Sequence, residues 1–323
     1  MAKKVVLLGM GGTIAGTSAS ASDNVGYTAA QVAVAQLLES VPGLPARLGD
    51  CGLEAEQVCQ IDSKDMDPAH WLALWTRAQA HLADAEVAAV VVTHGTDTLE
   101  ETAYFLSRVL ATELRHKPLV LTCAMRPASS LTPDGPGNMA DAISVALSPG
   151  AAGVLVVCAG QVHGAAAVQK VHPYRVDAFD SGESAALGVV EEGRLRLLGA
   201  WPAAVPPLES AVLQRLRTLP WPRVELVYSH AGASGHLVRA LLADSAADHA
   251  LRGLVVAGTG NGTLHQALQA ALLEAQACGV QVLRVSRCAY GQVVGADAGP
   301  FPAAPESPVK ARIALQLALA AQP

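Results

Sequence analysis

The segment from residue 88 to residue 102 limits the fold most strongly, because an apolar run passes through a polar turn directly into a helical pattern. Residues 88–92 are all alanine or valine, which is typical of a strand buried on both faces of a parallel sheet. Glu100 and Glu101 follow in the first turn of the predicted helix, where the helix dipole favours carboxylates. The turn at 93–98 is therefore predicted to lie at the carboxyl end of a strand, where open α/β sheets bind their ligands.

A second segment has the same organisation. The apolar run Lys4–Gly9 leads into a glycine-rich turn that carries Thr13. If both strands are parallel in one sheet, their carboxyl ends lie at the same edge, and Thr13 and Thr96 face one crevice. The central prediction from the residues is that the hydroxyls of Thr13 and Thr96 lie close together at one edge of the sheet.

The rest of the chain alternates strands and helices, the pattern of a doubly wound, mainly parallel α/β sheet. Prolines interrupt every regular pattern between residues 193 and 222. We therefore expect an N-terminal catalytic α/β domain at 1–192, a linker at 193–222 and a smaller C-terminal α/β domain at 223–323. The expected strands lie at 4–9, 57–61, 88–92, 119–123, 153–158, 224–228, 253–257 and 280–285, and the expected helices include 139–147, 263–277 and one from Ser307 to the end.

Residues 17–26 are small and polar and directly follow the glycine-rich turn. A loop of this composition at this place favours a mobile lid over a site. The lid ends at Tyr27, and residues 28–31 have the pattern of a capping box that opens a helix to about residue 40.

Composition excludes several classes of protein. Hydrophobic residues make up 51% of the chain and charged residues 15%, which indicates a large buried core. The net charge of −6 argues against a nucleic-acid-binding or anionic-membrane surface. No apolar run approaches the roughly 20 residues that span a bilayer.

The sequence also gives no sign of a metal or cofactor. Its six cysteines are dispersed, without the spacing of a metal site, and the glycines at 9–12 lack a complete nucleotide-binding pattern. Dispersed cysteines and an N-terminus that enters a strand at once indicate a cytoplasmic protein. A periplasmic location would apply if a signal peptide had been removed.

Two motifs, GGTIAG at 11–16 and THGTDTLEETAYF at 93–105, resemble the signatures of the bacterial-type L-asparaginase family, closer to its type II pattern. Further segments similar to the family occur in order: DSKDM at 62–66, AMRP at 124–127, DGPGN at 134–138 and GNG at 260–262. The resemblance implies hydrolysis of L-asparagine to L-aspartate and ammonia without a cofactor. It also implies a homotetramer built as a dimer of dimers.

The resemblance assigns roles to individual positions. The implied catalytic residues are Thr13, Tyr27, Thr96, Asp97 and Lys170, and the implied substrate-binding residues are Ser63, Lys64, Gly95, Ala124 and Asn261. In the family, the tyrosine closes over the substrate, and the GNG loop reaches the active site of the neighbouring subunit. Many relatives carry glutamine where this chain has Lys64, so the choice between asparagine and glutamine stays open.

Chemistry supports the same residues. Amide hydrolysis needs an activated nucleophile, donors for the developing oxyanion and a proton for departing ammonia. Thr13 in its glycine-rich turn suits the nucleophile, and Thr96, Asp97 and Lys170 could form the activating network, with backbone N–H groups of both threonines as oxyanion donors. Asp97 would bind the substrate ammonium and Ser63 its carboxylate. The residues do not decide which threonine attacks, or whether one of them activates water.

Three alternatives remain beside an asparaginase. One is a non-catalytic amino-acid-binding or regulatory protein on the same scaffold, which would be expected to lack a threonine or the lysine. Another is a subunit of a tRNA-dependent amidotransferase, which would bring a further domain and a basic RNA-binding face. The third is an enzyme with substantial glutaminase activity. His94 is not assigned to catalysis, because no second histidine or cysteine marks a triad.

Overall fold

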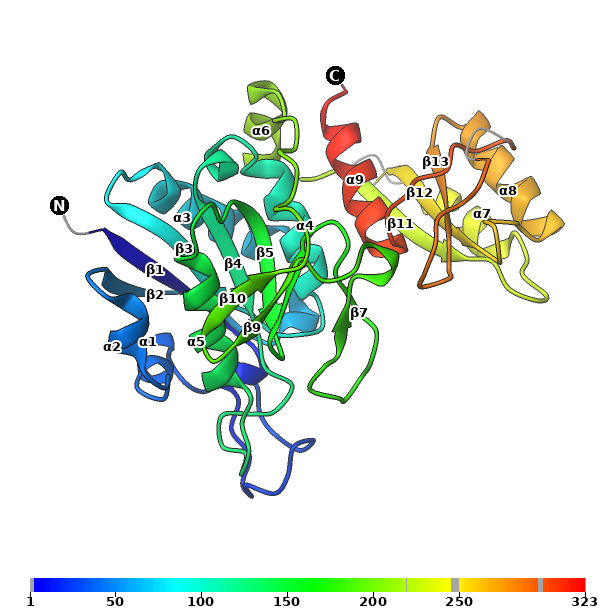
Figure 1. Cartoon of the computed structure of the whole chain (residues 1–323). Coiled ribbons are helices and arrows are strands. Elements are labelled where there is room, and N and C mark those ends of the chain that lie inside the picture. The colour runs from blue at the N-terminus through cyan, green and yellow to red at the C-terminus, as the bar shows by residue number, and fades with distance from the viewer. Residues whose placement is uncertain (1–2, 219, 245–249, 296–298, 323) are drawn as a thin grey trace. The chain divides into compact units, whose positions relative to one another are not determined.

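A computed structural model describes residues 3–218, 220–244, 250–295 and 299–322 of the chain. The chain divides into two compact units, Met1–Leu208 and Glu209–Pro323 (Figure 1). Each unit is an α/β structure with its own sheet. This confirms the predicted fold class of a larger N-terminal and a smaller C-terminal α/β domain.

The first unit is built on an eight-stranded sheet with the strand order β10-β9-β6-β5-β4-β3-β1-β2. The five strands from β2 to β5 in this order are parallel, and β6, β9 and β10 extend the sheet in antiparallel fashion. The strands are β1 Lys4–Gly11, β2 Gly52–Ile61, β3 Val87–Thr93, β4 Pro118–Thr122, β5 Gly153–Cys158, β6 Gln161–Gly164, β9 Gly188–Glu191 and β10 Arg194–Leu197. A separate short hairpin pairs β7 Gln169–Lys170 with β8 Phe179–Asp180.

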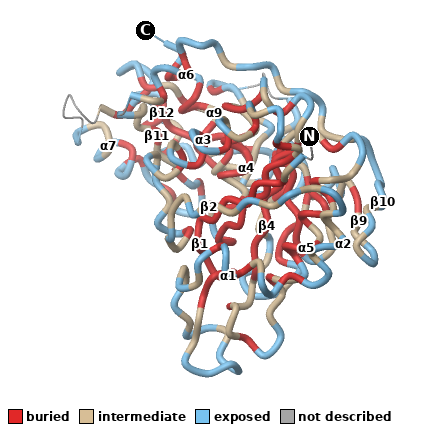
Figure 2. The backbone as a smooth tube through the Cα atoms, turned by 90° about the vertical axis from the view of Figure 1, so that its left-hand side faces the viewer, coloured by how far each residue is buried: buried red, intermediate tan, exposed pale blue. Residues whose placement is uncertain are grey.

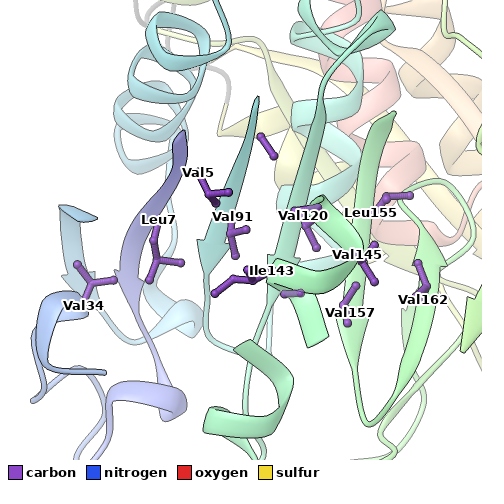
Figure 3. Close-up of a cluster of buried hydrophobic side chains, with 13 residues drawn as sticks. Val5, Leu7, Val34, Val91, Val120, Ile143, Val145, Leu155, Val157 and Val162 are labelled. Atoms are coloured by element: carbon purple, nitrogen blue, oxygen red, sulfur yellow. The ribbon is translucent and has the colours of Figure 1, made fainter. Parts of the chain in front are cut away.

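Helices cover both faces of this sheet, which explains why its central strands are apolar throughout. Helix α5 (Gly135–Ala146) packs against β3, β4 and β5, and α3 (Pro68–Ala83) packs against β3. Figure 3 shows Val91 and Val120 of the sheet together with Ile143 of α5 in the cluster between them, all fully buried. Burying one such side chain stabilises the fold by about 1.5–3 kcal/mol. The remaining helices are α1 Val34–Leu38, α2 Leu44–Leu48 and α4 Leu99–Val109.

The register of the sheet brings the two predicted turns together. Strands β1 and β3 are parallel neighbours, with Gly9 opposite Thr93. Beyond the strand ends the turns touch through their backbones, since a Cβ added at Gly12 would lie 2.3 Å from the Cα of Gly95. Gly12 also has φ +82°, a conformation that side-chain-bearing residues rarely adopt. The glycines therefore allow the contact that places both threonines at one edge.

The predicted capping box at residues 28–31 is wrong, and α1 begins only at Val34 without a side-chain cap. Thr28 instead forms an antiparallel bridge with Thr17. The N–H of Gln31 donates to the carbonyl of Ala15 at 2.6 Å. Because the glycine-rich turn and the base of the loop use these backbone groups, the capping geometry cannot form.

Other boundaries also shift for local reasons. Helix α5 begins at Gly135, four residues before the predicted start, with a proline in its first turn, where the missing N–H costs nothing. Helix α8 (Gln266–Ala277) begins after the predicted start, because Thr263 pairs with Thr259 and His265 accepts the N–H that caps the helix. The range 193–222, predicted as a linker, contains strand β10 and helix α6 (Ser210–Arg217).

The second unit has a three-stranded parallel sheet in the order β11-β12-β13. Its strands are β11 Arg223–Tyr228, β12 Leu251–Gly258 and β13 Gln281–Ser286, and its further helices are α7 His236–Ala243 and α9 Pro308–Ala320. Leu315 of α9 packs on one face of the sheet, and Leu268 of α8 packs on the other. No helix in the described ranges is long and apolar enough to cross a membrane.

Candidate active site

Thr13 and Tyr27 form the first pair of the site. Thr13 opens a short 3-10 helix, Thr13–Ala15, directly after β1, and its side chain is buried. Its Oγ1 lies 2.6 Å from the hydroxyl of Tyr27. The pair thus joins the turn after β1 to the end of the predicted lid.

Lys170 forms a second cluster of the site with Thr96 and Asp97, which lie far from it in the sequence. Its Nζ donates to Oγ1 of Thr96 at 2.8 Å and to Oδ1 of Asp97 at 2.6 Å. The lysine side chain is 18% exposed, whereas Asp97 is 51% exposed. The partly buried amine is therefore held between a buried hydroxyl and a carboxylate that can still reach a bound ligand.

Ser63 lies directly against the turn after β3. Its Oγ accepts the backbone N–H of Asp97 at 3.1 Å, and its carbonyl accepts the hydroxyl of Thr98 at 2.8 Å. A Cβ added at Gly95 would lie 2.4 Å from the Oγ of Ser63. Because Oγ acts as an acceptor here, the hydroxyl proton of Ser63 is left to donate to a ligand carboxylate.

The other predicted substrate-binding residues differ in their surroundings. Lys64 is exposed, and its Nζ forms ion pairs with Asp65 and Asp62. Ala124 is fully buried in the loop that follows β4. Asn261 belongs to the second unit, where its amide donates to the carbonyl of Val294 at 2.9 Å and accepts the N–H of Val294 at 2.7 Å. The structure thus joins Ser63 and Gly95 to the threonines, while the amide of Asn261 is occupied within its own unit.

The loop after β4 is held by two side chains whose roles the sequence did not reveal. The carboxylate of Asp134 accepts the N–H groups of Met125 and Arg126, both at 2.9 Å. Asn138, one helical turn later and buried, donates to the carbonyl of Cys123 at 2.9 Å. The sequence contains the motif DGPGN, but it does not show what the motif bonds to. Only the packing of α5 shows that Asp134 and Asn138 of this motif bind backbone groups of the chain just beyond the end of β4.

The predicted lid contacts the loop that follows β4. The N–H of Ser18 donates to Oγ of Ser129 at 2.8 Å, and the N–H of Leu131 donates to the carbonyl of Ala21 at 2.9 Å. The two loops run side by side at the bottom of Figure 1 and are largely exposed in Figure 2. The predicted lid is therefore closed at its base by the Thr17–Thr28 bridge and held beyond it by hydrogen bonds to the loop after β4.

His94 is buried beneath the site and has a defined tautomer. Trp71 Nε1–H can only donate, and it bonds to Oγ1 of Thr102 at 2.9 Å. The hydroxyl of Thr102 then donates to Nε2 of His94 at 3.0 Å, and Nδ1–H of His94 donates to the carbonyl of Gly95 at 2.7 Å. Burial lowers the pKa of His94 to about 4, although the bond to Gly95 opposes this shift. His94 is therefore a neutral, buried group under the turn that carries Thr96 and Asp97.

This burial predicts a pH-dependent stability. The pKa of His94 is about 4 when folded, below the ordinary value of 6.5, so unfolding is accompanied by proton uptake between these pH values. The free energy of unfolding is unaffected by protonation of His94 above pH 6.5. It falls as the pH is lowered below 6.5, because only the unfolded state binds the proton, and the loss at pH 4.5 is about 2–3 kcal/mol. Denaturant unfolding at pH 7 and 4.5 measures it. We expect a smaller loss in His94→Gln, and parallel losses in both proteins would contradict the prediction.

No group of three histidine, cysteine or acidic side chains in the described part of the chain is arranged to hold a metal ion.

Comparison with known proteins gives consistent matches along the chain. Residues 4–202 match the family model described as Asparaginase, N-terminal, and residues 223–323 match the Glutaminase/Asparaginase C-terminal domain. The chain is 37% identical to the glutaminase-asparaginase of Pseudomonas fluorescens biotype A, over 90% of this chain and 77% of that protein. It is 34% identical to L-asparaginase 2 of Escherichia coli (strain K12), over 98% and 88% of the two chains.

A solved structure shows the same fold over nearly the whole length. It is a crystal structure described as a probable cytoplasmic L-asparaginase from Campylobacter jejuni, with a TM-score of 0.86 and 32% sequence identity. The match covers 99% of this chain and 96% of that chain.

Proposed function

The chain belongs to the asparaginase family, and from this we propose that it hydrolyses the side-chain amide of L-asparagine to L-aspartate and ammonia. The observation that carries the proposal is the position of Lys170, whose Nζ contacts both Thr96 and Asp97. Thr13 and Tyr27 form a second hydroxyl pair after the adjacent strand. Two threonine hydroxyls, each hydrogen-bonded to a group that can exchange a proton, are suited to an acyl transfer in two steps.

In the proposed mechanism Thr13 attacks the side-chain carbonyl, and the hydroxyl of Tyr27, 2.6 Å away, accepts the threonine proton while it passes its own proton on towards the amide nitrogen. The C–N bond breaks, the protonated nitrogen leaves as ammonia, and water then releases aspartate from the acyl-enzyme. Thr96, Asp97 and Lys170 activate this water and carry its proton, and the departing oxygen of Thr13 is protonated again.

Recognition of the substrate uses the same cluster. The exposed carboxylate of Asp97 binds the ammonium group of asparagine, and the hydroxyl of Ser63 donates to its carboxylate. The backbone N–H groups of Thr13 and Thr96 stabilise the oxyanion. The backbone at Gly95 and Ala124 lies at the ends of the two strands β3 and β4 that frame this region.

Ammonia release from L-asparagine by the purified protein tests the function. Thr13→Ala and Thr96→Ala are both expected to lose most turnover, and mass spectrometry after rapid quenching identifies the acylated threonine. An acyl group on Thr96 would reverse the assignment of the nucleophile. A wild-type protein that binds asparagine without releasing ammonia would favour the non-catalytic amino-acid-binding alternative.

L-Glutamine is a second candidate substrate, because relatives include the glutaminase-asparaginase of Pseudomonas fluorescens biotype A. Lys64 pairs with Asp62 and Asp65, and its side chain is 60% exposed. We therefore expect Lys64→Gln to change kcat/KM for either amide less than about threefold, as for exposed ion pairs. Ammonia release from both substrates measures this, and a selective rise for glutamine would instead assign Lys64 to specificity.

The assembly proposed for this protein is a homotetramer built as a dimer of dimers. Its support is the family to which the chain belongs. Light scattering coupled to size-exclusion chromatography measures the mass, and a stable monomer with full activity would contradict both the tetramer and a contribution of Asn261 to a neighbouring site.

We also propose a cytoplasmic location. All six cysteines are free in the structure, and the Campylobacter jejuni structure is described as cytoplasmic. Fractionation of the native host tests the location, and recovery with periplasmic markers would contradict it.

A further inference from the structure

Lys170 is attached at two points to one short segment of the chain. Its Nζ contacts Thr96 and Asp97, and its backbone N–H donates to Oε2 of Glu100 at 2.8 Å. Thr96 and Asp97 precede α4, and Glu100 lies in the first turn of that helix. Both nitrogen atoms of the lysine are thus held by residues 96–100, seventy positions earlier in the chain.

Apart from this attachment, the only regular secondary structure described around Lys170 is a very short strand pair. Strand β7 contains only Gln169 and Lys170, and it pairs with the equally short β8 in a sheet of two strands. The eight-stranded sheet therefore does not determine where this lysine lies. A rigid helix start is a firmer support than a two-residue strand, because its backbone is fixed by its own hydrogen bonds and by packing.

We propose that Glu100 is a positioning residue for Lys170. Its carboxylate fixes the main chain of the lysine to the helix that follows Thr96 and Asp97, so that Nζ lies within hydrogen-bond reach of both partners. Glu100 acts through the lysine, not on the substrate. The consequence for turnover rests on the proposed function, whereas the consequence for the lysine's backbone does not.

The hydrogen bond requires an acceptor at residue 100 but not a full negative charge. Glu100→Gln retains a side-chain oxygen that can accept the N–H of Lys170, whereas Glu100→Ala removes the acceptor. Glu101→Ala is the matched control, because Glu101 lies in the same first turn and contributes equally to the helix dipole.

Steady-state kinetics with L-asparagine provides the first readout. We expect kcat of Glu100→Ala to fall at least about tenfold with KM within twofold, since small displacements of catalytic groups cost up to about a hundredfold. Glu100→Gln and Glu101→Ala should stay within about threefold of wild type. An equal loss in Glu101→Ala, or a loss in Glu100→Gln as large as in Glu100→Ala, would overturn the proposal.

Hydrogen exchange of the Lys170 amide provides a readout that does not depend on activity. We expect faster exchange in Glu100→Ala than in wild type, and near-wild-type exchange in Glu100→Gln and Glu101→Ala. Unchanged exchange in Glu100→Ala would overturn the proposal even if turnover fell. If wild type released no ammonia, the proposed function would fail, and the exchange pattern would still decide the role of Glu100.

A double-mutant cycle separates positioning from general destabilisation. If Glu100 acts only through the lysine, adding Glu100→Ala to Lys170→Met should lower the residual turnover less than twofold. A further tenfold loss in the double variant would show an independent effect and overturn the proposal.

Discussion

Replacement of Lys170 by methionine is expected to lower kcat for L-asparagine about a thousandfold. The amine lies 2.8 Å from Oγ1 of Thr96 and 2.6 Å from Oδ1 of Asp97, and it is the group that can move a proton between them. Positioned acids and bases contribute about 10²–10⁴-fold to such reactions. Methionine has similar length but cannot exchange a proton, so the change removes the chemistry with little change in volume.

Ammonia release measures kcat, and calorimetric titration with the product L-aspartate, which neither protein hydrolyses, measures binding. Because Asp97 and Ser63 remain, we expect the Kd of Lys170→Met to stay within about tenfold of wild type. Lys3→Met, at an exposed position before β1, is the control for loss of one lysine. If Lys170→Met retained a tenth of the wild-type rate, the amine could not be the proton carrier.

The second large effect is expected from Gly12→Ala. A Cβ at Gly12 would lie 2.3 Å from the Cα and 2.4 Å from the backbone nitrogen of Gly95, and neither atom belongs to a side chain that can move aside. The φ of +82° adds backbone strain. We expect the free energy of unfolding to fall by about 3–5 kcal/mol. We also expect kcat/KM to fall more than about a hundredfold, since the turns with Thr13 and Thr96 must separate.

Gly137→Ala is the matched control, because a Cβ there meets no atom within 4 Å and the residue lies in helix α5. Alanine in place of glycine within a helix is expected to raise stability by about 0.5–1 kcal/mol, with activity unchanged. Denaturant unfolding and ammonia release compare the two variants. Wild-type stability in Gly12→Ala would show that the two turns do not touch as the structure indicates.

Much of the fold could be predicted from short windows of sequence. The run 88–92 and the run 5–8 are apolar throughout because both faces of their sheet are covered, and each is followed by a turn that contains glycine and threonine. Hydrophobic periodicity and turn residues act over a few positions, so strands β1 and β3 and the start of α4 follow from local pattern. The capping box at 28–31 failed because a distant group, the carbonyl of Ala15, took one of its backbone donors.

The sequence by itself determined which chemical groups follow the strands: two threonines, a carboxylate and a serine, in motifs that also identify the family. Only the tertiary structure decided their partners. Lys170 meets Thr96 across more than seventy positions, and Glu100 accepts its N–H, because sheet order and helix packing bring these segments together. Local preferences cannot specify such pairs, since the energy of a long-range contact depends on the packing of the whole domain.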